Sequence, residues 1–448
     1  MKAFKAYDIR GIYGRDFDGT TVYRIGFFLP GLLSAARVLV GYDCRESTPE
    51  VLRNLIKGIT DAGADVFNIG LATTPMVYFA TAMHGFKASV QITASHNPGE
   101  YNGLKISREG ALPVGYDSGL KELEIMVENN NVEPTEVKGK VVQLTNIKDE
   151  YLSFLKEFRG DYSNLEFGID CSNGMASILV CDLFGSAPEV IYDTLDGTFP
   201  NHPPNPLEEE NTRDLKNLVL EKELDIGVIF DGDADRVMFV DDRGRFIRPD
   251  LITAVLGLHY LLERKGYVLC DIRTSRAVME YIEKLGGRPY MWKVGHSHAK
   301  MKMKELNALY GGELAGHYYF SEFFNCDSGM LAALLVLNIA VQLKMNGITF
   351  SSLIDSISTY SNSGEVNFRI DDKKAAMERL KDYFTSRVKP DAVYDFDGYR
   401  IEFPDWWFSI RPSNTEPYLR LVIEAADEEL LESKLNKIKE LLGSEGHC

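Results

Sequence analysis

Three aspartates lie within five residues in the segment Phe230 to Arg236, whose sequence is FDGDADR. Apolar runs flank this segment on both sides, so we expect a short loop between two strands. Crowded carboxylates repel one another unless a cation lies between them, and oxygen ligands on a short loop suit Mg²⁺. The candidate metal ligands are therefore Asp231, Asp233 and Asp235.

Two other interpretations apply to such a loop. A calcium-binding EF-hand does not fit, because the sixth loop position holds Arg236 where that loop needs glycine, and the flanking residues indicate strands rather than helices. An acidic turn that merely faces solvent remains the alternative.

A serine follows the strand predicted over Ala88 to Ile92, in the segment TASHNP. Ser95 is thus placed at a strand end, where side chains become accessible. The adjacent His96 suggests a hydrolase, but neighbours in an extended chain point in opposite directions and no G-x-S-x-G sequence surrounds Ser95. An ordinary turn is the alternative, because Asn97-Pro98 and Asn102-Gly103 are both turn sequences.

Other loops carry groups that could bind anions or sugars. Arg411 is followed by three small polar residues in the segment RPSNTEP, which suits a phosphate clamp or a capped turn. The loop Gly311 to His317 presents Glu313 and His317, which could contact sugar hydroxyls, move protons or simply be solvated. Arg10 and the segment Lys293 to Ser297 are weaker candidates, for which an ion pair or a helix cap is the alternative.

The composition is that of a globular protein with 448 residues, 45% of them hydrophobic, which predicts two to four domains. The net charge is −17 and no basic stripe is present, so nucleic-acid binding is not expected as the main activity. Six scattered cysteines without a C-x-x-C pair favour reduced thiols. The sequence start lacks an apolar signal core, and the apolar stretch from Met330 to Gln342 is too short to span a bilayer. We expect a cytoplasmic protein with no membrane partner.

A pattern of strand, aspartate, polar loop and helix occurs three times, with the aspartates at Asp43, Asp170 and Asp271. Together with the alternation of apolar runs and amphipathic stretches, this pattern predicts three α/β domains of similar topology. From about Tyr360 the pattern changes to hairpins and two helices, which predicts a smaller α+β domain. The expected domains are 1–145, 146–243, 244–358 and 359–448.

Together these loops resemble the α-D-phosphohexomutase family, most closely its phosphomannomutase/phosphoglucomutase branch. The resemblance covers nearly the whole chain and rests on four loops in the family's order: Thr93 to Pro98, Asp231 to Arg236, Gly312 to His317 and Arg411 to Thr415. It implies three α/β domains with mixed sheets flanked by helices, and a fourth domain of the TATA-binding-protein-like type, around a central cleft.

The resemblance also implies reversible transfer of phosphate between C1 and C6 of a hexose, through a phosphoserine at Ser95 and a hexose 1,6-bisphosphate, which also serves as activator. Mg²⁺ would contact Ser95 and the three aspartates, with Arg236 beside the phosphate. The implied catalytic residues are Ser95, Lys105, Arg10, His96 and His317. The implied substrate-binding residues are Glu313, Ala315, His317, Arg273, His296, Arg411, Ser413, Asn414 and Thr415.

Two departures from the family pattern affect the detail. Ala234 replaces a frequent glycine, which should fit if its backbone keeps a negative φ. Ala315 replaces a serine that could contact a sugar hydroxyl, which leaves the preferred hexose open.

Several functions therefore remain open. Mannose phosphate is the expected substrate, with a phosphoglucomutase or phosphoglucosamine mutase as alternatives. A phosphosugar phosphatase and a catalytically silent phosphosugar-binding protein are the others. The sequence does not predict whether the chain is a monomer or a dimer.

Overall fold

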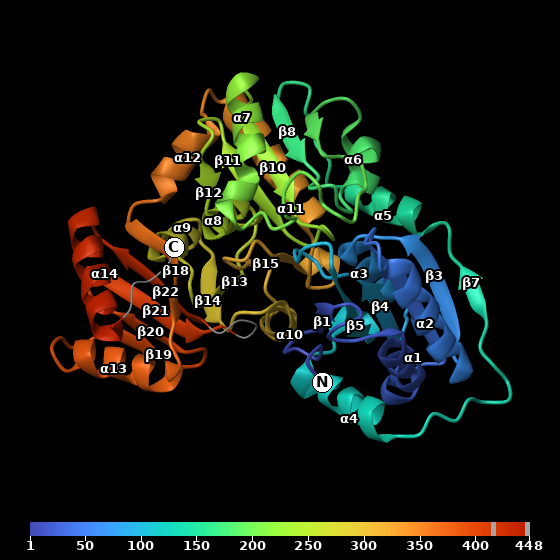
Figure 1. Cartoon of the computed structure of the whole chain (residues 1–448). Coiled ribbons are helices and arrows are strands. Elements are labelled where there is room, and N and C mark those ends of the chain that lie inside the picture. Colours follow the sequence, from blue (N-terminus) through green and yellow to red (C-terminus); the bar gives the residue numbers. More distant parts are fainter. Residues whose placement is uncertain (414–417, 444–448) are drawn as a thin grey trace.

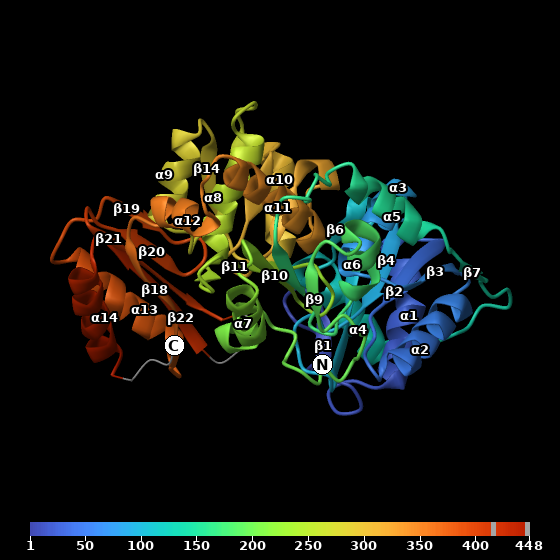
Figure 2. The same cartoon turned by 90° about the horizontal axis from the view of Figure 1, so that it is seen from above.

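The computed structural model describes residues 1–413 and 418–443 and contains four separate β-sheets. The sheets follow one another along the chain, and Figure 1 shows the first and the last at opposite ends of an arc. A second view gives the same arrangement (Figure 2). The predicted architecture of three α/β domains and a C-terminal α+β domain is confirmed.

The first domain contains strands β1 (Ile9–Ile12), β2 (Arg37–Tyr42), β3 (Asp65–Leu71), β4 (Ala88–Ile92), β5 (Tyr101–Arg108), β6 (Leu112–Pro113) and β7 (Val141–Gln143), and helices α1 (Gly19–Leu33), α2 (Thr48–Asp61), α3 (Thr74–Met83) and α4 (Leu120–Asn129). The second contains α5 (Ile147–Lys156), β8 (Phe167–Asp170), α6 (Ser177–Phe184), β9 (Glu189–Ile191), α7 (Arg213–Glu221), β10 (Ile226–Phe230), β11 (Val237–Asp241) and β12 (Phe246–Ile247).

The third domain contains α8 (Pro249–Tyr260), β13 (Tyr267–Asp271), α9 (Arg276–Lys284), β14 (Arg288–Trp292), α10 (His296–Leu306), β15 (Tyr310–Gly312), β16 (Tyr318–Phe320), β17 (Cys326–Asp327), α11 (Gly329–Met345) and α12 (Phe350–Ile357). The fourth contains β18 (Ser361–Arg369), α13 (Lys373–Thr385), β19 (Ala392–Tyr394), β20 (Tyr399–Glu402), β21 (Trp406–Pro412), β22 (Tyr418–Ala425) and α14 (Glu428–Leu442).

One strand order occurs in each of the first three domains: β3-β2-β4-β5, then β9-β8-β10-β11, then β14-β13-β15-β16. In every copy the first three strands are parallel and the fourth is antiparallel. The central strands are continuous apolar runs because helices cover both faces, and β10 (IGVIF) is buried at every residue.

The hydrophobic core is shared unequally among the domains. One cluster runs from Leu39 to Ile357 and takes side chains from each of the first three domains, with the almost entirely buried helix α11 among them. The fourth domain has a separate cluster, formed between its sheet and α13 and α14, which lie together on one face (Figure 1). The first domain also has a cluster of its own, with residues from Ala3 to Val127, so it is the shared cluster that joins the first three domains, and the described residues of the fourth take no part in it.

Local predictions differ from the structure at a few places. Asn102 and Gly103 do not form a turn: they lie inside β5, because Gly103 pairs with Arg10 of β1 where a Cβ would meet the Ile9 carbonyl oxygen at 2.2 Å. Helix α4 continues to Asn129, into the polar segment Glu128 to Pro134, whose composition predicts a break in regular structure. Strand β19 was not predicted, since its three residues are too few for a period to show.

Within the described residues, no single helix has the length and apolar composition needed to cross a membrane, although the bent pair α11 and α12 meets that test jointly. The five cysteines described are free thiols.

Candidate active site

The three chemistry-bearing loops occupy the same position in three copies of one topology. Ser95 lies between β4 and β5, the aspartate loop joins β10 to β11, and the loop from Glu313 to His317 joins β15 to β16. Each loop connects the third strand of its copy to the antiparallel fourth. The sequence repeat therefore brings one loop from each domain to a common place.

Ser95 faces the aspartate loop directly. Its side-chain hydroxyl donates to Asp231 Oδ2 at 2.8 Å, and Arg236 Nη2 lies 3.4 Å from the same Oγ. Ser95 is only 3% exposed and has a left-handed backbone, with φ 51°. The Ser95 hydroxyl thus lies between a carboxylate and a guanidinium supplied by another domain.

The left-handed backbone at Ser95 corrects one expectation. His96 does not point away from Ser95: its Nδ1 lies 3.4 Å from Ser95 Oγ, because the chain is not extended at this point. Burial, with the nearby Arg236 and Arg10 cations, lowers the pKa of His96 well below its usual range, so its ring is neutral near pH 7.

Arg45 anchors the serine loop, although no sequence motif predicted a role for this residue. Its guanidinium is fully buried and donates to four main-chain carbonyls of that loop. The acceptors are Ser95 (2.8 Å), Asn97 (2.7 Å), Pro98 (2.5 Å) and Tyr101 (3.1 Å). Arg45 is itself held by Asp43, at 3.0 Å from Nε. The equal spacing of Asp43 to Arg45 and Asp271 to Arg273 was the signal that could have found it.

The aspartate loop forms a site of the kind that holds a divalent cation. Carboxylate oxygens of Asp231, Asp233 and Asp235 lie within 4.8 Å of one another, and all three residues are at most 2% exposed. Asp233 Oδ1 and Asp235 Oδ1 are buried acceptors that have no hydrogen-bond partner among the described residues. Burial and the two neighbouring carboxylates raise the pKa of Asp231 to about 7. Unsatisfied hard oxygens in a dry cluster fit a metal ion.

Ala234 within this loop differs from the expectation. Its φ is +59°, not negative, so it adopts the left-handed conformation that favours glycine. The alanine methyl is buried in the shared core, and this packing offsets part of the backbone strain.

Lys105 and Arg10 lie at the rim of the cluster. Lys105 Nζ is 2.6 Å from Asp233 Oδ2 and also binds Asp235. Burial opposes the charge on Lys105, but these carboxylates outweigh it and raise the pKa of the ammonium. Arg10 donates to Asn97 Oδ1 at 2.9 Å and pairs with Asp8.

The third-domain loop is joined to the aspartate loop through the main chain. Arg236 and His317 form an isolated antiparallel bridge, and Val237 N donates to the Gly316 carbonyl at 3.2 Å. His317 Nδ1 lies 2.7 Å from Asp327 Oδ2 and 3.9 Å from Asp235 Oδ1. Burial alone would lower the pKa of His317, but these carboxylates raise it.

Glu313 is buried with both oxygens engaged. Oε1 accepts from Gly295 N at 2.6 Å and Oε2 from the Tyr319 hydroxyl at 2.5 Å, and burial raises the pKa of the Glu313 carboxyl. Its neighbour Ala315 is half-buried. His296 begins α10, and its ring lies 6.0 Å from that of His317.

The arginine loop comes from the fourth domain. Arg411 is buried and its Nε lies 3.4 Å from Asp397, which accepts from Val294 N at 2.9 Å in the third domain. Ser413 N donates to the Tyr418 carbonyl at 2.9 Å. Asn414 and Thr415 lie outside the described residues. Arg273 is held by Asp271, at 2.7 Å from Nη2, and reaches Glu365 of the fourth domain.

The second domain lacks an arginine at the position of Arg45 and Arg273. Ser172 stands there, and its N–H donates to Asp170 Oδ1 at 2.8 Å. The partner for the carboxylate is His202, whose Nε2 lies 3.1 Å from Asp170 Oδ2 and which belongs to the proline-rich segment Pro200 to Pro206 between β9 and α7. Burial opposes the charge on His202, but Asp170 raises its pKa. A histidine from a remote loop thus serves where the other copies use arginine.

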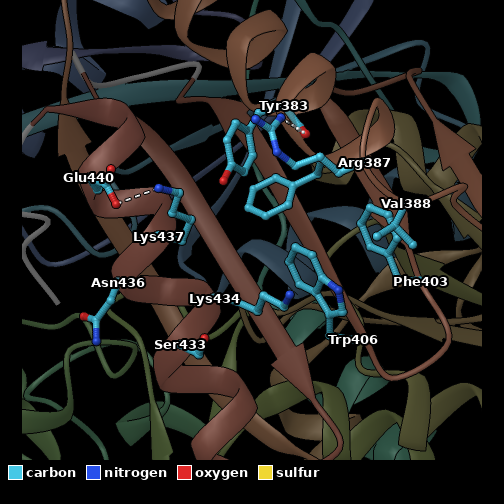
Figure 3. A pocket seen from close by; sticks show the side chains of 11 residues that line it. Tyr383, Arg387, Val388, Phe403, Trp406, Ser433, Lys434, Asn436, Lys437 and Glu440 are labelled. Carbon is cyan, nitrogen blue, oxygen red and sulfur yellow. Dashed lines mark hydrogen bonds and ion pairs between the residues drawn. The ribbon is translucent and has the colours of Figure 1, made fainter.

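A cavity of about 500 Å³ lies elsewhere, between α13, α14 and the turn before β21. Figure 3 shows Lys434 beside Trp406 and Tyr383 beside Arg387 in this cavity. The indole and the Phe403 ring are stacked 4.8 Å apart and belong to the core of the fourth domain. The cavity contains none of the serine, aspartate or histidine groups described above.

Comparisons with known proteins agree with this geometry. Four family models match in order: phosphoglucomutase/phosphomannomutase alpha/beta/alpha domain I at 1–132, domain II at 149–244, domain III at 248–360 and the C-terminal domain at 365–441.

Full-length relatives match over nearly all of the chain. A phosphomannomutase of Escherichia coli (strain K12) is 35% identical over 456 residues, covering 99% of both chains. A phosphomannomutase of Methanocaldococcus jannaschii is 36% identical, covering 99% of this chain and 98% of its own. The crystal structure of a phosphoglucomutase/phosphomannomutase family protein from Burkholderia thailandensis superposes with a TM-score of 0.87 at 28% identity, over 98% and 97% of the two chains. This chain belongs to the phosphoglucomutase/phosphomannomutase family of α-D-phosphohexomutases.

Proposed function

We propose that the protein interconverts hexose 6-phosphate and hexose 1-phosphate, with mannose 6-phosphate and mannose 1-phosphate as its principal pair. The observation that carries this proposal is the Ser95 hydroxyl, held 2.8 Å from Asp231 and 3.4 Å from Arg236. A serine in that position can accept and donate a phosphoryl group. The choice of mannose is supported by the similarity of the whole chain to proteins named phosphomannomutase.

In this reaction phosphorylated Ser95 transfers its phosphoryl group to the free hydroxyl of a hexose phosphate. The oxygen–phosphorus bond at the serine breaks as the bond to the sugar hydroxyl forms, and the sugar gives up its proton. The hexose 1,6-bisphosphate then turns over, and its other phosphate returns to Ser95. The same bisphosphate acts as activator by phosphorylating a free Ser95.

The chain's own residues divide this work. Arg236 neutralises charge on the phosphoryl group, and the loop of Arg411 and Ser413 holds the phosphate that is not reacting. Lys105, with Arg10, is the first candidate for moving the proton at the reacting hydroxyl. While Lys105 is paired with Asp233 and Asp235 its raised pKa keeps it protonated, so in that state it can donate a proton but cannot accept one. His317 is the second candidate. Asp231, Asp233 and Asp235 would hold Mg²⁺, which supplies charge stabilisation at the transferring phosphate. We propose that the protein is cytoplasmic, because the described cysteines are free thiols and the cytoplasm keeps thiols reduced.

A coupled assay with Mg²⁺ and a hexose 1,6-bisphosphate tests the proposal, with mannose, glucose and glucosamine 1-phosphates as substrates. The wild type is compared with Ser95→Ala and with Ser153→Ala, a control serine exposed on α5. We expect mannose to rank first, and turnover to be lost in Ser95→Ala only.

Other outcomes contradict parts of the proposal. A clear preference for glucosamine 1-phosphate would overturn the choice of sugar. Release of inorganic phosphate faster than isomerisation would indicate a phosphatase. Binding without turnover, after mass spectrometry has shown Ser95 to be phosphorylated, would indicate a silent binding protein.

A further inference from the structure

Glu365 bridges two arginines that belong to different domains. Its Oε2 lies 3.1 Å from Arg273 Nη1 of the third domain, and its Oε1 lies 2.9 Å from Arg420 Nη1 of the fourth. Arg273 is 3% exposed at its side chain, whereas Glu365 and Arg420 are 20% and 21% exposed. One carboxylate therefore lies in a fork of two guanidiniums at the domain boundary.

The backbone of β18 is shaped to place this carboxylate. The register with β22 shifts between Asn362 and Glu365, and Gly364 has φ 63°. Ser363 Oγ accepts from Ile423 N at 2.9 Å and so satisfies a main-chain donor at the irregularity. Bulges of this kind redirect a side chain and are frequent beside active sites.

Arg420 lies beside Arg411, the first residue of the segment expected to clamp a phosphate. It is directly opposite Arg411 in the β21–β22 ladder, and side chains at directly opposed positions lie on the same face of the sheet. Glu365 pairs with Val422, two residues from Arg420, and so lies on that face as well. The other face carries Phe408, Ile410 and Leu421, which form the core of the domain.

The arginine fork has the composition of a phosphate site. Two guanidiniums that converge on one point bind a phosphate through several charge-assisted hydrogen bonds, and a carboxylate binds in the same manner with less charge. Arg273 keeps Asp271 as a separate partner at 2.7 Å, so exchange of Glu365 for another anion would not leave that guanidinium unpaired.

We propose that in the substrate-free protein the Glu365 carboxylate occupies the position of a substrate phosphate between Arg273 and Arg420. The non-reacting phosphate of the hexose displaces this carboxylate when it binds. This inference rests on the proposed function for the identity of the sugar, but its anion chemistry is independent of turnover. Because Glu365 competes with the phosphate, it weakens the binding of phosphosugars.

The test measures binding of inorganic phosphate and of mannose 1-phosphate to the Mg²⁺-loaded full-length protein by titration calorimetry. Glu365→Gln keeps the size of the side chain and removes its charge. The matched control is Glu402→Gln, because Glu402 also lies between two arginines of the third and fourth domains, 2.8 Å from Arg400 and 3.8 Å from Arg276. Arg420→Gln removes the proposed ligand, and Arg420→Lys tests for partial rescue.

We expect Glu365→Gln to lower the Kd of both ligands by about fivefold or more, because the site is freed of its internal competitor. Glu402→Gln should leave both values unchanged, and Arg420→Gln should raise them, with partial recovery in Arg420→Lys. An unchanged or higher Kd in Glu365→Gln overturns the proposal and makes Glu365 a structural contact. An equal gain in Glu402→Gln also overturns it, because a loosened domain boundary would then be the cause.

Failure of the proposed function gives a different pattern. If the protein does not turn over any hexose phosphate, but inorganic phosphate still binds more tightly to Glu365→Gln, the displacement stands and the reaction is wrong. If turnover is normal and the phosphate Kd is the same in both proteins, the reaction stands and the displacement is wrong. A thermal melt of each variant checks that it is folded.

Discussion

Arg45 binds the main-chain carbonyl of Ser95, fifty residues away, at 2.8 Å from Nη2. The same guanidinium binds three further carbonyls of that loop, so the loop closes around a buried cation and not around apolar side chains. This contact stabilises the left-handed backbone of Ser95 and thereby fixes the hydroxyl that faces Asp231. Arg45 is a positioning residue, because its contacts with the serine are to the main chain.

Replacement of this cation tests its role. Arg45→Met should destabilise the protein by about 3–5 kcal/mol, because it leaves Asp43 and the loop carbonyls buried without their partner. Turnover should fall more than a hundredfold as the loop loses its shape, since a misplacement of about 1 Å costs on that order. Thermal melts and the mutase assay measure both effects. Arg37→Met is the control, because Arg37 is exposed at the start of β2, and equal losses in the two variants would contradict this role.

The aspartate loop and the serine loop touch at Gly232. A Cβ at this position would lie 2.5 Å from the Ser95 carbonyl oxygen, which is main chain and has little room to move. Gly232→Ala should therefore separate Ser95 from Asp231 and lower kcat by about tenfold or more, while the protein still folds. Steady-state kinetics measure the change. Gly31→Ala in α1 is the matched control, since a Cβ there meets nothing within 4 Å; unchanged kcat in Gly232→Ala would show that this contact is not critical.

Cation binding should be visible without any substrate. Mg²⁺ should raise the melting temperature of the wild type, and a chelator should reverse the rise, because a ligand bound only to the folded state stabilises it. Asp233→Asn removes one buried charge and should abolish the shift. Glu122→Gln, at an exposed position on α4, should keep it. A full Mg²⁺ shift in Asp233→Asn would place the cation elsewhere.

The His202–Asp170 pair should make stability depend on pH. The pKa of His202 is raised above its ordinary value of 6.5 in the folded protein. While Asp170 is ionised, the charge on His202 therefore contributes its full stabilisation below about pH 6.5 and loses it as pH rises through the folded-state pKa of His202. Burial raises the pKa of Asp170, which limits this stabilisation on the acid side. His202→Gln should lower the melting temperature most near pH 5.5, and the difference should disappear at high pH. A difference that grows with pH would give the opposite sign and refute the assignment.

Much of the fold could be predicted because its strands are buried on both faces. Continuous apolar runs such as Ile226 to Phe230 are recognisable in the sequence as buried strands. The aspartates at the ends of β2, β8 and β13 indicated the repeat of one topology. The alternative of a turn at Asn102 and Gly103 is wrong, because local propensity favours a hairpin there, while the pairing with β1 requires a strand. Short strands such as β19 give no period to detect.

The site was predictable in part and for a different reason. Ser95 and the three aspartates stand out because few chemistries besides metal binding and group transfer require those residue types at that spacing. Arg45 binds main-chain carbonyls of a loop fifty residues away, and His202 pairs with the distant carboxylate of Asp170. Nothing next to either residue in the sequence indicates these partners. The left-handed backbone at Ser95 and Ala234 likewise could not be predicted, because neither residue is a glycine and the tertiary contact of Ser95 with Arg45 is not visible in the sequence.

The main-chain bridge between Arg236 and His317 fixes the aspartate loop relative to the loop that carries Glu313. A main-chain bond also joins Thr74 N to the Asp233 carbonyl at 3.0 Å, so the first domain, the aspartate loop and the Glu313 loop are connected through the main chain. Across the described part of the chain, contacts between the third and fourth domains run instead through side chains such as Glu365, Glu424 and Asp397. If the hexose turns over as proposed, each of its two reacting ends would meet the same main-chain framework, and the change in the position of the other phosphate would be taken up at the side-chain contacts of the fourth domain.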